Sequence, residues 1–109
     1  MIKTKESYKE YLLSDDWKEK RGEKLQSTNK CGICASTKQL DVHHLNYRNW
    51  TDVKQSDLRV LCRKCHFLAH DLEKSGQLIY RNKNHHSRWA LLKNAVKKAQ
   101  ERQMVNLFR

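Results

Sequence analysis

Four cysteines occur as two pairs with the same spacing. Cys31-Gly-Ile-Cys34 and Cys62-Arg-Lys-Cys65 are separated by 27 residues. A two-residue spacer lets a tight turn aim both sulfurs at one point, and Gly32 can adopt the backbone conformation that such a turn often needs. Two pairs together supply the four thiolates of a closed tetrahedral zinc site, which is structural because no coordination position stays open. Disulfides and free thiols are the alternatives, and an expected reducing compartment favours zinc over both.

Four histidines flank the two cysteine pairs. His43 and His44 are adjacent and end a strand-like run, whereas His66 directly follows the second pair and His70 comes four residues later. We expect a helix over residues 66–75, in which positions four apart share a face, so that His66 and His70 can hold one ligand. One of the adjacent histidines can join them. The alternative is that packing or extra zinc contacts satisfy these rings, but four histidines beside the cysteine pairs favour a second site.

Such a set of histidines suits the hydrolysis of a phosphodiester. The reaction needs a water that loses a proton near neutral pH, an in-line attack, and positive charge where the phosphoryl and leaving oxygens become negative. Histidine titrates near neutral pH, and a divalent cation with only two or three protein ligands keeps positions open for substrate. Because neighbouring residues of a strand point to opposite faces, His43 and His44 can take different tasks.

The tracts 42–47 and 57–66, together with His70, resemble the two signature stretches of the HNH endonuclease family. The resemblance covers about residues 31–70. It implies a ββα-metal motif, in which a strand ending in paired histidines is followed by a loop, a second strand and a helix with the closing histidine. In the similar cysteine-bearing subclass a zinc ion holds the motif together, here through Cys31, Cys34, Cys62 and Cys65. Residues 11–17 also resemble the short helical lead-in of phage and bacterial members.

The resemblance also implies the role of each residue. His44 corresponds to the general base, and His43 and His66 correspond to ligands of a catalytic divalent cation, which is Mg²⁺, Mn²⁺, Ni²⁺ or Zn²⁺. His70 matches a third ligand position that only some members use. The family's middle asparagine, which orients the loop of the base, corresponds to Asp57, and an ionised Asp offers only hydrogen-bond acceptors. The implied activity is metal-dependent DNA hydrolysis, nicking as a monomer or cutting both strands as a dimer.

The charge points to a polyanionic partner. The chain has 23 Lys and Arg against 12 Asp and Glu, for a net charge of +11. DNA is the favoured partner, ahead of an anionic membrane surface. Residues 31–78 hold 7 basic and 5 acidic side chains (net +2), and residues 79–109 hold 8 and 1 (net +7). The predicted DNA contacts are Arg48, Arg63, Lys64, Lys93, Lys97, Lys98 and Arg102.

Two alternatives stay open, one for the role of the basic helix face and one for the function of the protein. Charged helix faces are usually solvated surfaces, although the last third lacks the Glu–Lys pairing typical of them. A noncatalytic zinc module that binds nucleic acid is the alternative function. Phosphate contacts carry no base information, and no separate specificity domain is recognisable. We therefore expect low specificity, or specificity that a homodimer or a protein partner supplies.

These features predict one small α+β domain, a ββα-metal motif on a four-Cys zinc site flanked by N-terminal and C-terminal helices. A chain of 109 residues with 38% hydrophobic residues has a small core, which zinc binding can supplement. Residues 1–30 form the helical lead-in, residues 31–78 the zinc-stabilised core, and residues 79–109 a basic C-terminal helix. The chain has no apolar run near the ~18 residues of a membrane span and no apolar signal segment, so we expect a cytoplasmic protein of a bacterial or phage-infected cell.

The flanking helices have recognisable signals. In the lead-in, helices are expected over residues 7–13 and from Ser14 or Asp15 toward Thr28, with core contacts from Tyr8, Leu12, Trp17 and Leu25. In the last third, an apolar stripe predicts a helix from about Ser87, its cap, to Leu107. The stripe consists of Trp89, Leu92, Val96, Ala99 and Gln103. The pair His85-His86 is expected in a loop before this helix, because Asn82-Lys-Asn84 is turn-like.

Overall fold

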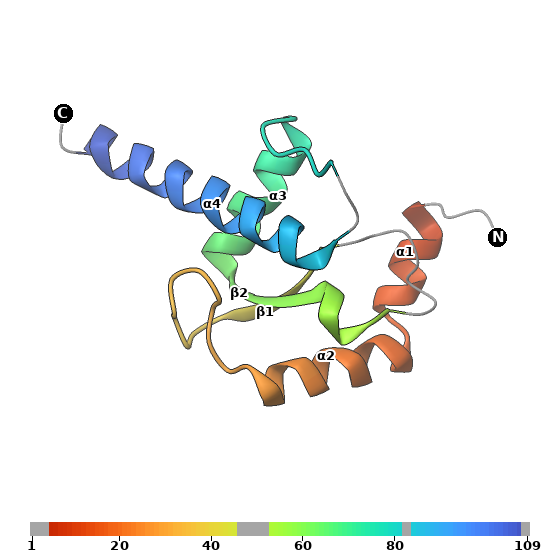
Figure 1. The fold of residues 1–109 in the computed structure, drawn as a ribbon. Coiled ribbons are helices and arrows are strands. Elements are labelled where there is room, and N and C mark those ends of the chain that lie inside the picture. Colours follow the sequence, from red (N-terminus) through yellow and green to blue (C-terminus); the bar gives the residue numbers. More distant parts are fainter. Residues whose placement is uncertain (1–4, 46–52, 82–83, 108–109) are drawn as a thin grey trace.

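The computed structural model describes residues 5–45, 53–81 and 84–107 of the chain. Four helices and two strands follow one another, with a short 3₁₀ helix before the second strand (Figure 1). They are α1 (Lys5–Leu12), α2 (Asp15–Ser27), β1 (Leu40–His44), η1 (Gln55–Asp57), β2 (Leu58–Cys62), α3 (Arg63–Lys74) and α4 (His85–Leu107). The chain is therefore a small α+β fold, as the sequence predicts.

The lead-in forms the two predicted helices. The side chain of Ser14 accepts a hydrogen bond from the backbone N–H of Trp17 at 3.2 Å and so caps α2, whose first turn holds two acidic residues. Thr28 ends α2 with its backbone N–H donating to the carbonyl of Lys24. The first helix ends one residue earlier than expected, at Leu12. Trp17 is only 6% exposed and forms part of the core, as predicted.

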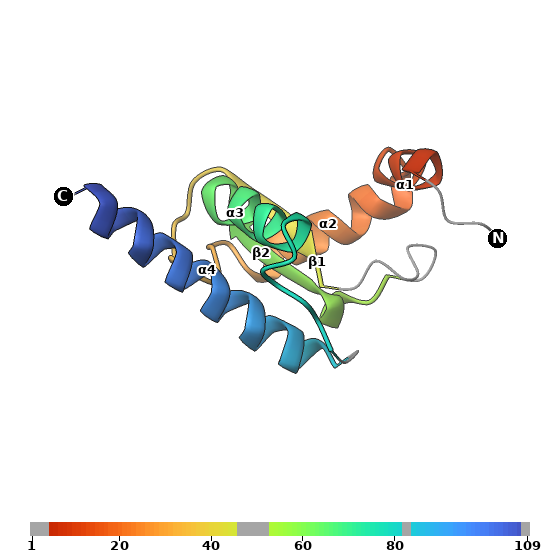
Figure 2. The same ribbon diagram turned by 90° about the horizontal axis from the view of Figure 1, so that it is seen from above.

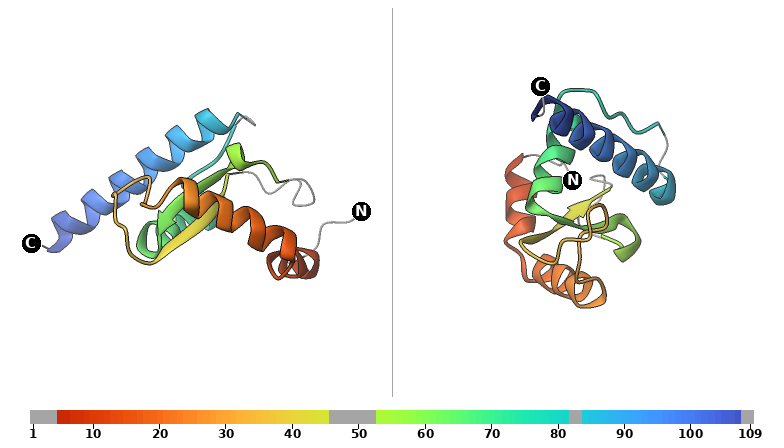
Figure 3. Two further views of the ribbon diagram at one scale, coloured as in Figure 1. Left: turned by 90° about the horizontal axis from the view of Figure 1, so that it is seen from below. Right: turned by 90° about the vertical axis from the view of Figure 1, so that its left-hand side faces the viewer.

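The sheet consists of β1 and β2 in antiparallel pairing, with Val42 opposite Val60 and His44 opposite Leu58. Helix α2 contacts both strands from one side and α3 contacts both from the other (Figure 3). Because side chains alternate along a strand, Val42 and Val60 join the apolar cluster of Tyr11 and Trp17. Leu61 joins a second cluster with α3 and α4. The sheet thus separates two small cores.

Helix α3 begins at Arg63, three residues earlier than predicted. Cys62 is both the last residue of β2 and the extended residue that precedes the helix. The backbone N–H of Arg63 donates to the carbonyl of Gln39 at 2.8 Å, which ties this junction to the start of β1. The second cysteine pair therefore spans the strand end and the first helical turn. The predicted helical relationship of His66 and His70 is confirmed.

Helix α4 runs from His85 to Leu107, so it begins two residues before the predicted start and ends at the predicted residue, but the predicted cap at Ser87 is wrong. The side-chain oxygen of Asn84 accepts hydrogen bonds from the backbone N–H groups of His86 and Ser87 at 2.9 and 3.1 Å. Asn is as good a cap as Ser, and here it lies earlier in the chain. His85 and His86 therefore form the first turn of the helix and not a loop.

The buried face of α4 packs on α3. Leu92, Val96 and Ala99 are buried as predicted, whereas Gln103 is exposed and lies outside the core. Figure 2 shows the C-terminal end of α4 running past the rest of the fold. In the described part of the chain, no helix combines the length and apolar character needed to cross a membrane.

Candidate metal centres

The four cysteines converge as predicted. Their sulfurs all lie within 4.8 Å of one another, and Cys34 Sγ is 3.6 Å from Cys62 Sγ. A disulfide would bring two sulfurs to about 2.05 Å. Four sulfurs at about 2.3 Å from a zinc ion, in tetrahedral geometry, lie about 3.8 Å apart. The donor type, number and spacing therefore fit zinc.

The turn of the first pair prepares Cys31 to act as a thiolate. Burial raises the pKa of Cys31, but hydrogen bonds from the backbone N–H groups of Cys34, Cys62 and Ile33 outweigh it and lower the pKa to about 7. Two of these donors, Cys34 and Ile33, lie 3.5 and 3.4 Å from the sulfur. Burial also raises the pKa of Cys65 well above its usual value. A cation is what allows such closely packed sulfurs to ionise together.

Two residues of α4, Trp89 and Gln100, pack against the two cysteine pairs. The sequence did not predict these contacts. A Cβ on Gly32 would lie 2.8 Å from the ring of Trp89, so any larger residue at this position would force the ring or the turn to shift. The expectation that Gly32 supplies an unusual backbone conformation is wrong, because the positive φ of this turn belongs to Ala35. Gln100 donates a hydrogen bond to Cys65 Sγ at 3.3 Å. Helix α4 is thus part of the support of the cysteine cluster.

A second group of possible metal ligands consists of His43, His66 and His70. One ring nitrogen from each lies within 4.8 Å of the others, and the Nε2 atoms of His66 and His70 are 3.0 Å apart. Two imidazole nitrogens at about 2.1 Å from one cation, at a right angle, are also about 3.0 Å apart. The structure therefore brings together the three histidines predicted as ligands, in a geometry that fits a divalent cation.

Two carboxylates lie behind these rings. Asp41 Oδ2 is 3.3 Å from His66 Nδ1, and Glu73 Oε1 is 3.9 Å from His70 Nδ1 and 3.5 Å from His43 Nε2. Metal-binding histidines usually present their second nitrogen to a carboxylate, which fixes the ring. Burial raises the pKa of Glu73 to about 7, against the opposing effects of Arg88 and Tyr80.

These carboxylates were missed by sequence reasoning, although spacing could have found them. Asp41 lies two residues before His43, on the same face of β1. Glu73 lies three residues after His70, on the same face of α3. A search for Asp and Glu at such offsets from predicted histidine ligands would have selected both.

His44 lies on the opposite side of β1 from His43, as predicted. Its ring stacks on Trp17 with centroids 4.5 Å apart and 29° between the planes, and Tyr8 and Tyr11 approach it edge-on. The residue is 4% exposed, and burial lowers the pKa of His44 to about 4. The ring is therefore neutral at neutral pH. His44 also lines a cavity together with His66 and His70.

The backbone of Leu45, directly after His44, makes two hydrogen bonds, one with the main chain and one with a side chain. The backbone N–H of Leu45 donates to the carbonyl of Asp57 at 2.7 Å, and the guanidinium of Arg88 donates to the carbonyl of Leu45 at the same distance. Asp57 thus touches the segment next to His44 through its main chain. The orienting role of its side chain stays a prediction.

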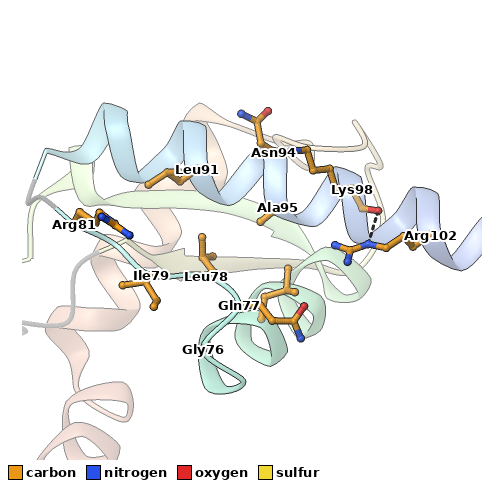
Figure 4. A pocket seen from close by; sticks show the side chains of 11 residues that line it. Gly76, Gln77, Leu78, Ile79, Arg81, Leu91, Asn94, Ala95, Lys98 and Arg102 are labelled. Carbon is orange, nitrogen blue, oxygen red and sulfur yellow. Dashed lines mark hydrogen bonds between the residues drawn. The ribbon is translucent and has the colours of Figure 1, made fainter.

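The predicted DNA-binding residues that the structure describes belong to two helices, α3 and α4. Arg63 and Lys64 are exposed in the first turn of α3, where Arg63 Nε lies 3.8 Å from Asp41 Oδ2. On α4, Lys93 lies over the ring of Trp89, on the side that faces the cysteines. Lys98 and Arg102 line a groove on another side of the helix, with Leu78, Ile79 and Leu91 (Figure 4). Lys97 is exposed, and Arg48 lies outside the described residues.

Comparison with protein-family models and with curated proteins finds no match to this chain.

Proposed function

We propose that this chain is a divalent-metal-dependent endonuclease of the HNH type, which hydrolyses phosphodiester bonds of DNA. In this proposal β1, β2 and α3 form a ββα-metal motif. One observation carries it: the ring nitrogens of His43, His66 and His70 converge within 4.8 Å, and the neighbouring His44 shares a cavity with two of them. A set of metal ligands beside a separate neutral imidazole is what phosphodiester hydrolysis requires.

The three ligand histidines and His44 would divide the work. A divalent cation held by His43, His66 and His70 would supply positive charge to the phosphoryl and leaving oxygens. His44 would accept the proton of the attacking water through its ring nitrogen, and its stack on Trp17 holds the plane of the ring. Asp41 and Glu73 would orient the ligand rings from behind.

The cysteine cluster would hold the motif together. Cys62 joins the end of β2 to the start of α3, and His66 is the fourth residue of the same helix. Zinc binding at Cys31, Cys34, Cys62 and Cys65 would therefore fix the position of α3 against the sheet. Zinc binding energy becomes folding energy in modules of this size.

The basic residues would bind the phosphate backbone. Residues 79–109 carry 8 basic side chains and 1 acidic one, and basic residues that contact phosphates position the protein without reading bases. One active site attacks one strand. A monomer would therefore nick DNA, and cutting both strands would require a dimer or two events.

The test is a supercoiled plasmid incubated with the zinc-loaded protein and a panel of added cations, namely Mg²⁺, Mn²⁺, Ni²⁺ and Zn²⁺. The wild-type protein should nick or linearise the plasmid with at least one cation, and the His44→Ala protein should not. His86→Ala is the matched control, because it removes an exposed histidine of α4. Equal cleavage by the wild-type and His44→Ala proteins would refute the assignment of His44.

A noncatalytic zinc module that binds nucleic acid is the second candidate. The burial of His44 at 4% exposure favours it, because a ring packed between aromatic side chains can serve the core alone. This candidate predicts salt-sensitive DNA binding with no cleavage in any cation. Plasmid cleavage that depends on His44 excludes it.

A further inference from the structure

A cavity of about 300 Å³ lies between the lead-in helices and the proposed catalytic residues. Helices α1 and α2 provide one part of its lining, and β1 and α3 provide the other. From the helical lead-in come Tyr8, Leu12, Trp17 and Arg21, and from the proposed active-site side come Asp41, Val42, His44, His66 and His70.

The lining has two chemically different parts. The histidines and Asp41 form a polar part, which suits a phosphate and a cation. Tyr8, Leu12 and Trp17 form an apolar and aromatic part. Tyr8 and Leu12 lie four residues apart on α1 and therefore share a face of the helix. A phosphodiester gains little from contact with such side chains.

The component of a nucleotide that does gain from an aromatic and aliphatic wall is the base, because every base has a π-face that stacks on aromatic rings. The wall lies beside the site proposed for the scissile phosphate. A base attached to the adjacent sugar is therefore within reach of it.

We propose that this cavity receives an unpaired nucleobase next to the bond that is cut. The substrate class is then DNA with a single-stranded nucleotide at the cut, such as a single strand, a flap or a bubble. In continuous duplex the bases are paired and stacked, and a base must leave the stack before it can enter a protein pocket. This inference rests on the proposed nuclease function and deepens it.

Arg21 extends the same surface. It is exposed and lines the cavity from α2. A guanidinium at this place can pair with a phosphate that flanks the bound nucleotide. The lead-in helices would thus select the form of the substrate, whereas the zinc-stabilised core would carry the chemistry.

The test compares DNA of one sequence as a single strand, as a duplex with a short unpaired bubble, and as a continuous duplex. 2-Aminopurine, a fluorescent base, replaces the bases around the cut one at a time. The wild-type protein should cut the bubble or single strand about tenfold faster than the duplex, or more, because only these offer a base without unstacking. Binding should quench 2-aminopurine at one position beside the cut, where the base stacks.

Two variants address the cavity in different ways. Tyr8→Ala removes part of the wall, and Leu12→Phe fills the space while keeping an apolar side chain. Each should lower the ratio of bubble to duplex cleavage toward one and reduce the quenching. Leu13→Ala is the matched control, since Leu13 is the next residue and is 75% exposed. Circular dichroism and thermal melting establish that each variant is folded.

The outcomes separate this proposal from the nuclease proposal. Equal cleavage of bubble and duplex by the wild-type protein, or a preference that survives both cavity variants, overturns the base pocket and leaves the nuclease intact. In a further outcome, the wild-type protein quenches 2-aminopurine, Leu12→Phe abolishes this quenching, and no cation supports cleavage. That result supports base binding in the cavity and overturns the nuclease proposal.

Discussion

Glu73 Oε1 lies 3.5 Å from His43 Nε2, although one residue belongs to α3 and the other to β1. The same oxygen is 3.9 Å from His70 Nδ1. A single carboxylate therefore contacts two of the three converging histidines, from the helix and from the strand. This contact links the two elements that the proposed cation would bridge.

Replacing Glu73 should weaken cation binding at the histidine cluster. Glu73→Gln keeps the size of the side chain but removes the carboxylate that contacts His43 and His70, so we expect an affinity loss of about 10-fold to 100-fold. Calorimetric titration of the zinc-loaded protein with Mn²⁺ or Ni²⁺ measures it. Asp71→Asn is the matched control, because it removes an exposed carboxylate from the same helix. Equal affinities of the two variants would contradict a role for Glu73.

Removing zinc should unfold the core. The sulfurs of Cys31, Cys34, Cys62 and Cys65 lie within 4.8 Å of one another, and a zinc ion bound to all four would join the turn of the first pair to the start of α3, so removing it takes away the binding energy that supports folding. The energy lost is comparable with the net stability of a small domain, about 5–15 kcal/mol. A strong chelator should therefore abolish the cooperative thermal transition followed by circular dichroism. Added Zn²⁺ should restore it and added Mg²⁺ should not; an unchanged melting temperature after zinc removal would refute the structural role.

The close packing of Trp89 on Gly32 should make the fold sensitive to a side chain at position 32. Gly32→Ala places a methyl group 2.8 Å from the indole ring and should destabilise the fold by about 1–3 kcal/mol through overpacking. Gly22→Ala is the control, because a Cβ there meets nothing within 4 Å and alanine favours the helix interior by about 0.5–1 kcal/mol. Urea unfolding of the two proteins should give changes of opposite sign. A stable Gly32→Ala protein would mean that Trp89 moves away freely.

The elements that local chemistry determines were predictable. The Ser14 cap depends on residues three apart, and the pairing of His66 with His70 depends on helical periodicity alone. The identical spacing of the two cysteine pairs predicted the four-sulfur cluster. Each of these signals acts within a few residues or repeats in the chain.

Features that depend on tertiary contacts were not predictable in the same way. Asn84 and Ser87 are both acceptable caps, and propensity alone did not decide between them. The reason for Gly32 is a ring 57 positions away in the chain. The stack of His44 on Trp17 joins α2 to β1, and no periodicity within either element encodes it.

The stack of His44 on Trp17 should fix the orientation of the imidazole. Trp17 covers one face of the imidazole at a centroid distance of 4.5 Å, so Trp17→Leu frees the ring to turn. A general base that loses its orientation lowers kcat, here by about tenfold or more. Trp17→Phe keeps an aromatic face and should retain more of the activity. Neither variant touches His43, His66 or His70 in the cluster, so calorimetry should show unchanged affinity for the catalytic cation. The contrary result is that both variants lose kcat to the same extent and also lose cation binding or folding. Trp17 would then support the fold without orienting His44.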